Sequence, residues 1–238
     1  MSTENPLISI IIPVYNEAEG IRNFLGELTE RTENDEQIEI IIVDGQSTDN
    51  TVDEIKKAGY TPITHSGKGR ARQLNAGVYR AKGDILYFLH ADTLPPFGFP
   101  NIICKEVARG TESGNFRLKF DTGHFLMRCY GWFTQFNLLP FRFGDQSIFV
   151  TRTAHQETGH YKEDHIVMED NEYIRRLRKR GNFKVLKHSV TTSARKYQEN
   201  GFVRLQLIFT LIFMLYYAGV SQEKLVKVYR KLIRVGKI

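Results

Sequence analysis

Short apolar runs alternate with amphipathic segments along the first ninety residues of the chain. The apolar runs predict strands at 7–13, 38–43, 60–64 and 84–89. Apolar residues at helical spacing and clusters of capping side chains predict helices at 18–31, about 51–58 and 70–81. Strands that alternate with helices in this way predict parallel βαβ units and therefore an α/β sheet.

The pattern becomes less regular after Pro95 and Pro96. Strands are expected at 115–120 and 147–151. Helices are expected at about 100–109, in the aromatic-rich segment 123–138, and at 169–180. Gly181 follows the last of these helices and is a typical helix end. We find no internal repeat, no low-complexity stretch and no clear linker.

The most apolar stretch of the chain is residues 205–220. Only Gln206 and Thr210 interrupt it clearly, but its 16 residues fall short of the roughly 20 needed to cross a hydrocarbon core. Basic residues flank the stretch on both sides. Two interpretations stay open: a helix that packs on the body of the protein, or an interfacial helix that lies on an anionic membrane.

Charge divides the chain into an acidic body and a basic end. Residues 1–170 carry 17 Lys and Arg against 24 Asp and Glu, and residues 171–238 carry 16 against 3, which gives the whole chain a net charge of +6. A basic end can meet nucleic acid, an anionic membrane or phosphate-bearing ligands, and composition does not choose among them.

Two further features bear on the compartment. The two cysteines are too few for a disulfide scaffold and match no metal or redox motif. The first residues lack the basic segment and long apolar core of a secretory signal. We therefore expect a cytoplasmic protein, with the C-terminal segment placing it peripherally on the inner face of the plasma membrane.

Polar residues follow each predicted strand of the first half. The segments after the strands are 13–17, 44–49, the glycine loop at 67–70 with His65 before it, and 90–93. Because ligands bind outside the carboxyl ends of the strands in an open α/β sheet, these segments predict a shared site. Taken singly, each has a structural explanation, such as a cap for Asp44 and Asp49 or a turn for Asn16.

Three groups of residues carry candidate chemistry. Asp92 leaves a buried strand and suits a hard divalent cation, although it could equally be a turn residue before Thr93. Lys68 and Arg70 lie at a glycine-rich helix start, which favours an anion, or else they are solvated loop charges. Asp170 begins a helix, as either an N-terminal cap or a general base.

Several motifs, taken in order, resemble the family 2 glycosyltransferases of the GT-A fold. The segments 9–17, 43–49, 69–77 and 83–93 are similar to the family's first strand, second strand, donor-side helix and metal-binding strand. In the last of these, His90 stands where the DxD motif has its first aspartate. The segments 143–149, 168–177 and 192–195 resemble a bacterial subgroup with His-Ala-Asp-Thr and Gly-Asp-Gln motifs, the last of them as a final strand.

The resemblance implies a Rossmann-like mixed sheet with helices on both faces, followed by C-terminal helices. It implies a glycosyltransferase domain over residues 1–200, with a donor half at about 7–94 and an acceptor half at about 95–200. Residues 201–238 would form a basic and apolar helical appendage.

The resemblance also implies a reaction, in which a sugar passes from a nucleotide-diphosphate sugar, with a UDP-sugar expected, to an acceptor hydroxyl with inversion at the anomeric carbon. The residues implied on the donor side are Pro13, Tyr15, Glu17, Asp44, Lys68, Arg70, His90 and Arg195. Asp92 would hold Mg²⁺ or Mn²⁺ on the diphosphate. Asp170 would be the base and Glu169 its neighbour or an acceptor contact.

On the acceptor side, Gly144, Asp145 and Gln146 are implied to shape the site. The acceptor is unknown, and a lipid-linked molecule is one expectation, together with an anionic membrane surface as a partner. Nucleic acid is not expected, since the aromatics near the basic end lie in an apolar stretch rather than a polar one.

Other functions remain as alternatives. A nucleotidyltransferase would bind nucleotide and metal in the same way but release pyrophosphate. A non-catalytic nucleotide-sugar-binding relative would keep the fold, although the intact Asp92, Glu169 and Asp170 argue against it. A methyltransferase would need a glycine-rich turn after the first strand, and residues 13–17 contain none.

Overall fold

The computed structural model describes residues 7–32, 37–65, 67, 69–142 and 144–234. The strands are β1 (Ile8–Val14), β2 (Ile38–Asp44), β3 (Ile63–Thr64), β4 (Ile85–Phe88), β5 (Thr93–Leu94), β6 (Ser113–Phe120), β7 (Ile148–Thr151) and β8 (Phe183–Thr192). The α-helices are α1 (Ile21–Arg31), α2 (Thr51–Lys57), α3 (Arg70–Arg80), α4 (Phe99–Ala108), α5 (Phe125–Phe133), α6 (Arg152–Thr158), α7 (Glu169–Arg180), α8 (Arg195–Asn200), α9 (Phe202–Tyr217) and α10 (Gln222–Leu232).

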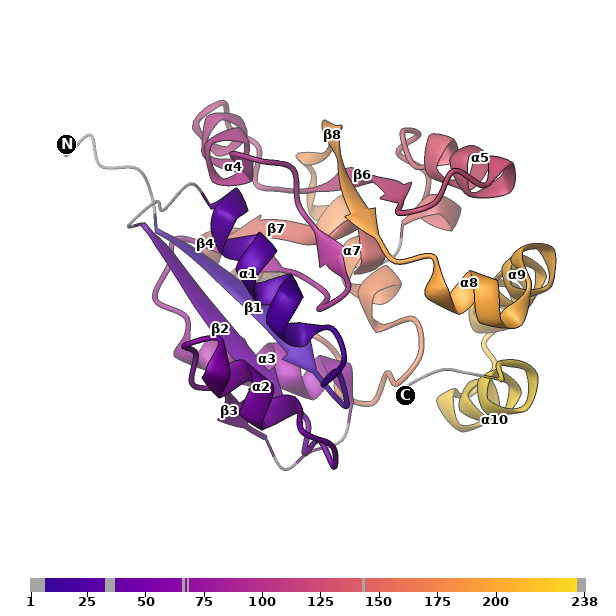
Figure 1. The fold of residues 1–238 in the computed structure, drawn as a ribbon. Coiled ribbons are helices and arrows are strands. Elements are labelled where there is room, and N and C mark those ends of the chain that lie inside the picture. Colours follow the sequence, from indigo (N-terminus) through magenta and orange to yellow (C-terminus); the bar gives the residue numbers. More distant parts are fainter. Residues whose placement is uncertain (1–6, 33–36, 66, 68, 143, 235–238) are drawn as a thin grey trace.

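These strands form one mixed sheet in the order β3-β2-β1-β4-β7-β6-β8-β5 (Figure 1). The first four are mutually parallel, as the βαβ pattern predicts. β7 then pairs antiparallel with both β4 and β6, while β6 and β8 run parallel. The mixed α/β architecture expected from the sequence is therefore confirmed.

Helices cover both faces of the sheet because β1 alternates its side chains between them. Ile8, Ile10 and Ile12 face one core cluster, which includes residues of α1, α2 and α4. Ile11 faces the other, which includes residues of α3, α6 and α7. Burial on both faces explains why the strands of the first half read as continuous apolar runs rather than as alternating ones.

The C-terminal helices lie beside the sheet, at the edge where α8 leaves β8 (Figure 1). Leu205, Ile208 and Ile212 of α9 pack with Val226 and Tyr229 of α10 in a third cluster. Val167 of the body belongs to the same cluster, so the helices rest on the segment that leads into α7. Within the described residues, no helix combines the length and apolarity that a membrane crossing requires. The division of the chain at residue 200 stays a prediction.

Two expectations about elements are wrong. The aromatic segment 123–138 forms a helix only over Phe125–Phe133, and Leu139–Phe141 is a short 3₁₀ turn. The segment 192–195, expected as a final strand, leaves the sheet at Thr192 and begins α8 at Arg195. The strand is the preceding segment, where Thr192 still pairs with Thr93 of β5 and Phe120 of β6.

Candidate active site

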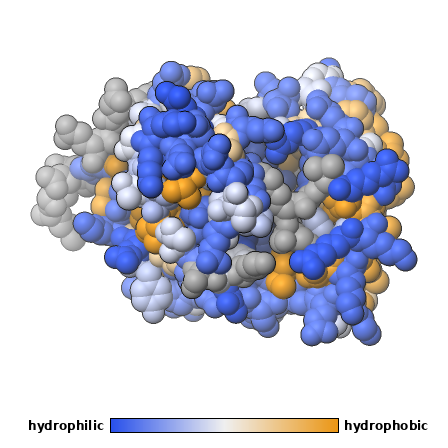
Figure 2. Space-filling view, turned by 60° about the horizontal axis from the view of Figure 1, so that its bottom comes forward, coloured by the Kyte–Doolittle hydropathy of each residue, from blue (hydrophilic) through white to orange (hydrophobic). Residues whose placement is uncertain are grey.

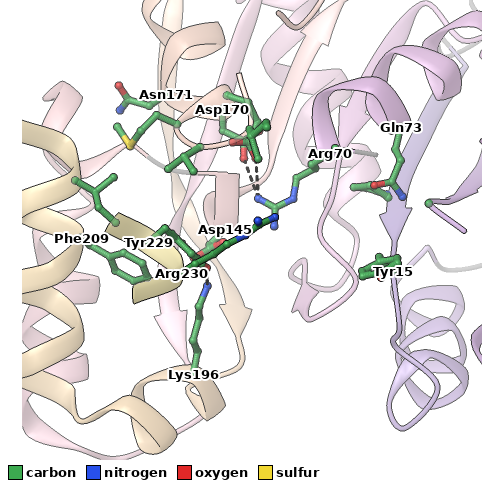
Figure 3. A pocket seen from close by; sticks show the side chains of 18 of the residues that line it. Tyr15, Arg70, Gln73, Asp145, Asp170, Asn171, Lys196, Phe209, Tyr229 and Arg230 are labelled. Atoms are coloured by element: carbon green, nitrogen blue, oxygen red, sulfur yellow. Dashed lines mark hydrogen bonds and ion pairs between the residues drawn. The ribbon is translucent and has the colours of Figure 1, made fainter. Parts of the chain in front are cut away.

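A cleft of about 360 Å³ opens at the carboxyl ends of the central strands. Its walls come from the end of β1, the start of α3, the turn at 144–146, the start of α7 and the helices α8–α10. Figure 3 shows Tyr15 and Gln73 on one side of this cleft and Phe209 and Tyr229 on the other, with Arg70 between them. The cleft therefore joins residues that lie more than two hundred positions apart.

The loops after β1 and β2 are bound to each other. The amide of Asn16 donates to Ser47 Oγ at 2.9 Å, and the amide of Thr48 donates to Asn16 Oδ1 at 2.8 Å. The carboxylate of Asp44 is buried and accepts bonds from the amides of Gln46 and Ser47. Asp44 thus closes its own loop in this structure, and its carboxylate is not part of the cleft lining.

Gln73 of α3 ties the helix to the two strands. Its buried amide donates to the carbonyl oxygens of Val14 and Val43, both at 2.8 Å. Neither carbonyl lies within a helix. That of Val14 also accepts the amide of Gly45 at 2.9 Å, so the bonds from Gln73 join a backbone contact that already links the two strand ends. Gln73 lines the cleft and fixes where α3 begins, and with it the position of Arg70.

An ion-pair cluster occupies the middle of the cleft. Glu169 and Asp170 begin α7, where the helix dipole favours negative charge. Both are buried, with 5% and 6% of their surfaces exposed. Arg70 Nη1 lies 2.9 Å from Glu169 Oε1 and 3.8 Å from Asp170 Oδ2 (Figure 3). Two buried carboxylates are therefore balanced by a cation from the opposite half of the sheet.

His90 bridges two carboxylates in the same cluster. Its Nδ1 lies 3.1 Å from Asp145 Oδ1, and its Nε2 lies 3.5 Å from Asp170 Oδ2. Burial and the nearby Arg70 oppose protonation, but the bonds to Asp145 and Asp170 prevail and raise the pKa of His90 to about 9. The aspartate expected at this motif position is thus replaced by a side chain that is cationic at neutral pH.

The same cluster also shifts the pKa values of Asp145 and Glu169. Desolvation opposes ionisation of Asp145, but His90 and Arg70 hold its pKa at about 2. Burial raises the pKa of Glu169, and the adjacent charge of Asp170 adds to this, while Arg70 acts against it. Perturbed titrations of this kind gather at functional sites, although structural ion pairs produce them too.

Backbone strain collects around the cleft. Three non-glycine residues with positive φ lie at the cleft: Met168 lines it, and Asn16 and Gln46 each adjoin a lining residue in the chain. Such conformations cost about 1–3 kcal/mol each and persist where the surrounding structure imposes them, often at active sites. Met168, at φ 67°, turns the chain directly into Glu169 and so orients both carboxylates.

Asp92 is the candidate metal ligand. It is exposed, and the hydroxyl of Thr93 donates to its Oδ1 at 3.2 Å. No cluster of three or more His, Cys, Asp or Glu suited to a metal exists among the residues that the structure describes. A single carboxylate fits Mg²⁺ or Mn²⁺ only where a bound diphosphate completes the coordination, and this is the usual arrangement for Mg²⁺.

The structure brings only some of the predicted site residues together. Pro13, Tyr15, Glu17 and Arg70 line the cleft with the Glu169–Asp170 pair and Asp145. Arg195 lies outside it, half exposed and 3.8 Å from Glu19. Lys68 lies outside the described residues.

The residues expected on the acceptor side divide between cleft and core. Gly144, Asp145 and Gln146 form one 3₁₀ turn, from which Asp145 enters the cleft. Gln146 is fully buried and bonds at 2.5 Å to Asn115 and to the buried Arg142. Arg142 also donates to the carbonyl oxygens of Thr134 and Phe136, so Gln146 belongs to a network that holds the turn in place.

Sequence reasoning missed the C-terminal wall of the cleft. Lys196, Phe209 and Arg230 line it, from α8, α9 and α10. The basic and apolar character of the C-terminal segment was visible in the sequence, but nothing in the pattern indicated which of its many cations would face the site.

Comparison with known proteins bears directly on the family. The sequence model of glycosyl transferase family 2 matches residues 9–155, which is more than half of the chain. The chain belongs to this family. The match covers every strand from β1 to β7 and ends before α7, so Asp170 and the C-terminal helices lie beyond it.

Two curated relatives and one solved structure illustrate the likeness. Glycosyltransferase AglE of Haloferax volcanii is 35% identical over 102 residues, which are 40% of this chain and 33% of that protein. The undecaprenyl-phosphate 4-deoxy-4-formamido-L-arabinose transferase of Shewanella sediminis is 29% identical over 107 residues, 41% of this chain and 32% of that protein. These alignments span about a third of the relatives' length.

The solved structure is a mannosyltransferase from Pyrobaculum calidifontis in complex with GDP-Man and Mn²⁺. It superposes with a TM-score of 0.70 at 17% identity and covers 99% of this chain and 66% of that one. Likeness at this identity establishes the fold. Together with the family match, it gives this member of glycosyl transferase family 2 a GT-A-type fold.

Proposed function

We propose that this glycosyltransferase moves a sugar from a nucleotide-diphosphate sugar to an acceptor hydroxyl in one inverting displacement. The observation that supports this most is the buried Asp170, which meets Arg70 and His90 in the same cleft as Tyr15 and Glu17. The wall that carries Tyr15 and Glu17 would hold the nucleoside. The acceptor would enter on the side of Asp145 and the C-terminal helices.

In the proposed step, the acceptor hydroxyl donates its proton to the carboxylate of Asp170 as its oxygen attacks the anomeric carbon. The bond between that carbon and the diphosphate oxygen breaks, its electron pair stays on the diphosphate, and a nucleoside diphosphate leaves. Attack and departure on opposite faces invert the anomeric configuration. Arg70 and His90 would hold the Asp170 carboxylate in place until the acceptor arrives.

Asp92 is the residue that would hold a divalent cation. When bound there, Mg²⁺ or Mn²⁺ would act as a Lewis acid that neutralises charge on the departing diphosphate. The related mannosyltransferase structure contains Mn²⁺ with its donor, which is compatible with this assignment. The base of the donor stays open: a UDP-sugar is expected from the sequence motifs, and that relative carries GDP-Man.

A donor panel tests the proposal. The protein is incubated with UDP-, GDP- and dTDP-sugars with Mn²⁺ or with EDTA, and nucleoside diphosphate release and donor binding are measured. We expect release with one donor, loss of release in EDTA, and a higher Mn²⁺ requirement for Asp92→Asn. Neither binding nor release with any donor would refute the assignment.

Asp170→Asn tests the base. Asp170 does not cap α7, because the N-cap residue is Met168 and no side-chain cap bond forms there. Asn keeps the shape of the side chain and removes its charge. The proposed role predicts a turnover loss of about 10²–10⁴-fold, typical of a lost general base, with unchanged donor affinity. Glu27→Gln, on exposed α1 surface, is the matched control and should behave as wild type.

A further inference from the structure

The C-terminal wall of the cleft differs in chemistry from the opposite wall. It consists of Lys196 from α8, Gln206, Phe209 and Ile212 from α9, and Tyr229 and Arg230 from α10. All of these residues lie beyond the segment that matches the family model. The wall combines positive charge with apolar surface, whereas Tyr15, Glu17 and Gln73 form the other side.

Lys196 is held in place without a carboxylate. Its ammonium donates to the hydroxyl of Tyr229 at 2.5 Å and lies 5.1 Å from that ring and 5.5 Å from the ring of Phe209. In Figure 3 the side chain points from α8 toward Asp145 and Arg230. Two aromatic rings and a hydroxyl therefore aim a cation at the middle of the cleft.

Arg230 also lacks a counter-charge. Among the described residues, three cationic side chains line the cleft: Arg70, Lys196 and Arg230. Arg70 pairs with Glu169, but no described carboxylate oxygen lies within 4.0 Å of Lys196 or Arg230. Lys196 acts on the carboxylate of Asp145 only from beyond that distance. Two cations on one wall without an ion-pair partner favour an anion that comes with a ligand.

Apolar surface lies directly beside these two cations. Phe209 and the half-exposed Ile166 offer this surface, while Ile212 and Val167 also line the cleft but are buried. The opposite face of α9 also exposes large apolar residues, with Val203 55%, Leu207 65% and Met214 56% exposed. A ligand that lies along this wall therefore meets charge and apolar surface within one helix width.

We propose that Lys196 and Arg230 form a subsite for the phosphate of an amphiphilic acceptor, whose apolar part packs on Phe209 and Ile166. The inference rests on the proposed function, because it takes the C-terminal wall as the acceptor side. It adds a substrate class, a phosphate-bearing amphiphile, and the residues that select it. The donor's own diphosphate is the other source of a phosphate, and the experiment separates the two.

Binding of decyl phosphate to the full-length chain, below its critical micelle concentration, tests the subsite. Isothermal titration calorimetry is run with and without UDP and Mn²⁺, with decyl maltoside and inorganic phosphate as comparison probes. We expect decyl phosphate to bind more tightly than either comparison probe. Phe209→Ala should weaken the binding of decyl phosphate and leave the affinity for inorganic phosphate unchanged.

Charge-removing variants make the test specific. Lys196→Gln and Arg230→Gln should each weaken the binding of decyl phosphate about tenfold, because each removes one charge-assisted contact. The affinity for UDP and GDP should stay unchanged. Lys227→Gln, exposed on the same helix α10 and outside the cleft lining, is the matched control and should bind normally. Gln can still bond to Tyr229, and a melting curve verifies folding of each variant.

Two results would overturn the inference. If the variants weaken the binding of UDP or GDP as much as that of decyl phosphate, the two cations bind the donor diphosphate. If decyl maltoside binds as tightly as decyl phosphate, or if no variant changes the affinity for decyl phosphate, the wall does not select an anion. Failure of the proposed function is recognised separately, because absent donor binding leaves decyl phosphate binding measurable.

Discussion

His155 is a buried histidine that the proposed chemistry does not use. Its Nδ1 lies 2.6 Å from the hydroxyl of Tyr173, and only 2% of the residue is exposed. Burial, with the neighbouring His160 and Arg152, lowers the pKa of His155 from 6.5 to about 4. The native state therefore holds this imidazole neutral under conditions in which the unfolded chain protonates it.

The sign of the resulting pH dependence follows. Between pH 6.5 and 4 the unfolded state binds more protons at this site, so the free energy of unfolding falls as the solution is acidified. At pH 5 the loss from this one group is about 2 kcal/mol relative to pH 7.5. His155→Gln, which keeps a hydrogen-bonding side chain but does not titrate, should remove that part of the loss.

Urea denaturation of wild type and variants at pH 7.5 and pH 5 measures this change in the free energy of unfolding. His188→Gln, at an exposed histidine on β8, is the control and should keep the wild-type difference between the two pH values. An undiminished acid loss in His155→Gln would contradict the assignment, because the fall would then come from carboxylates alone.

Individual site residues could be predicted where motif and strand end coincide. Asp170, Arg70 and Tyr15 were named from the sequence, and all three line one cleft. The sequence did not reveal that Asp44 closes its own loop, because only the loop geometry shows that its carboxylate already accepts hydrogen bonds from two backbone amides. Lys196 could not be chosen either, since Tyr229 holds it and lies 33 positions away.

At the scale of elements, Gly77 sets how closely α3 approaches the sheet. A Cβ at this position would lie 2.4 Å from Ile11 Cγ2 and 3.3 Å from Val43 Cγ2. Both atoms belong to buried strands in the centre of the sheet, so neither can move freely. Because α3 also carries Arg70 at its first turn, the same contact determines where the guanidinium reaches the cleft.

Gly77→Ala should therefore destabilise the protein by about 1–3 kcal/mol, the usual cost of overpacking, despite the higher helix propensity of alanine. Gly26→Ala in α1 is the matched comparison, since a Cβ there has nothing within 4 Å. It should stabilise by about 0.5–1 kcal/mol. Thermal and urea unfolding measure both, and equal effects of the two substitutions would show that the approach of α3 is not limiting.

The elements themselves were predictable where both faces of a strand are buried. β1, β2 and β4 appear close to their expected positions. β8 was missed because its pairing is irregular: Asn115 of β6 pairs with Val185 and Arg117 pairs with Ser189, so β8 advances four residues against two. That bulge leaves exposed charges within the strand and disguises its period. α10 lies within the helical appendage expected over 201–238, but its bounds were not predicted, because its apolar face packs on α9, a partner that the local pattern does not reveal.

At the scale of the whole molecule, the charge division acquires a location. Of the 16 basic residues over 171–238, five lie on α7 and two on β8, and seven lie on α8–α10, at the edge where α9 exposes its apolar face. Figure 2 shows apolar and strongly hydrophilic side chains side by side along that edge. Positive charge next to exposed apolar side chains matches the composition of an anionic lipid surface, and we propose peripheral binding there.

Vesicle co-sedimentation distinguishes peripheral binding to anionic lipid from a helix α9 that only packs on the body of the protein. We expect the protein to sediment with vesicles that contain about one-third phosphatidylglycerol, and to be released largely at about 0.5 M salt, where the Debye length falls well below 10 Å. Leu207→Gln, at a residue 65% exposed on α9, should weaken binding by removing buried apolar area. Phe97→Gln, at a residue 62% exposed beside Arg31 of α1, is the matched control and should not. Equal binding to neutral phosphatidylcholine vesicles would contradict the electrostatic part of the proposal, and equal binding of the two variants would contradict the role of α9.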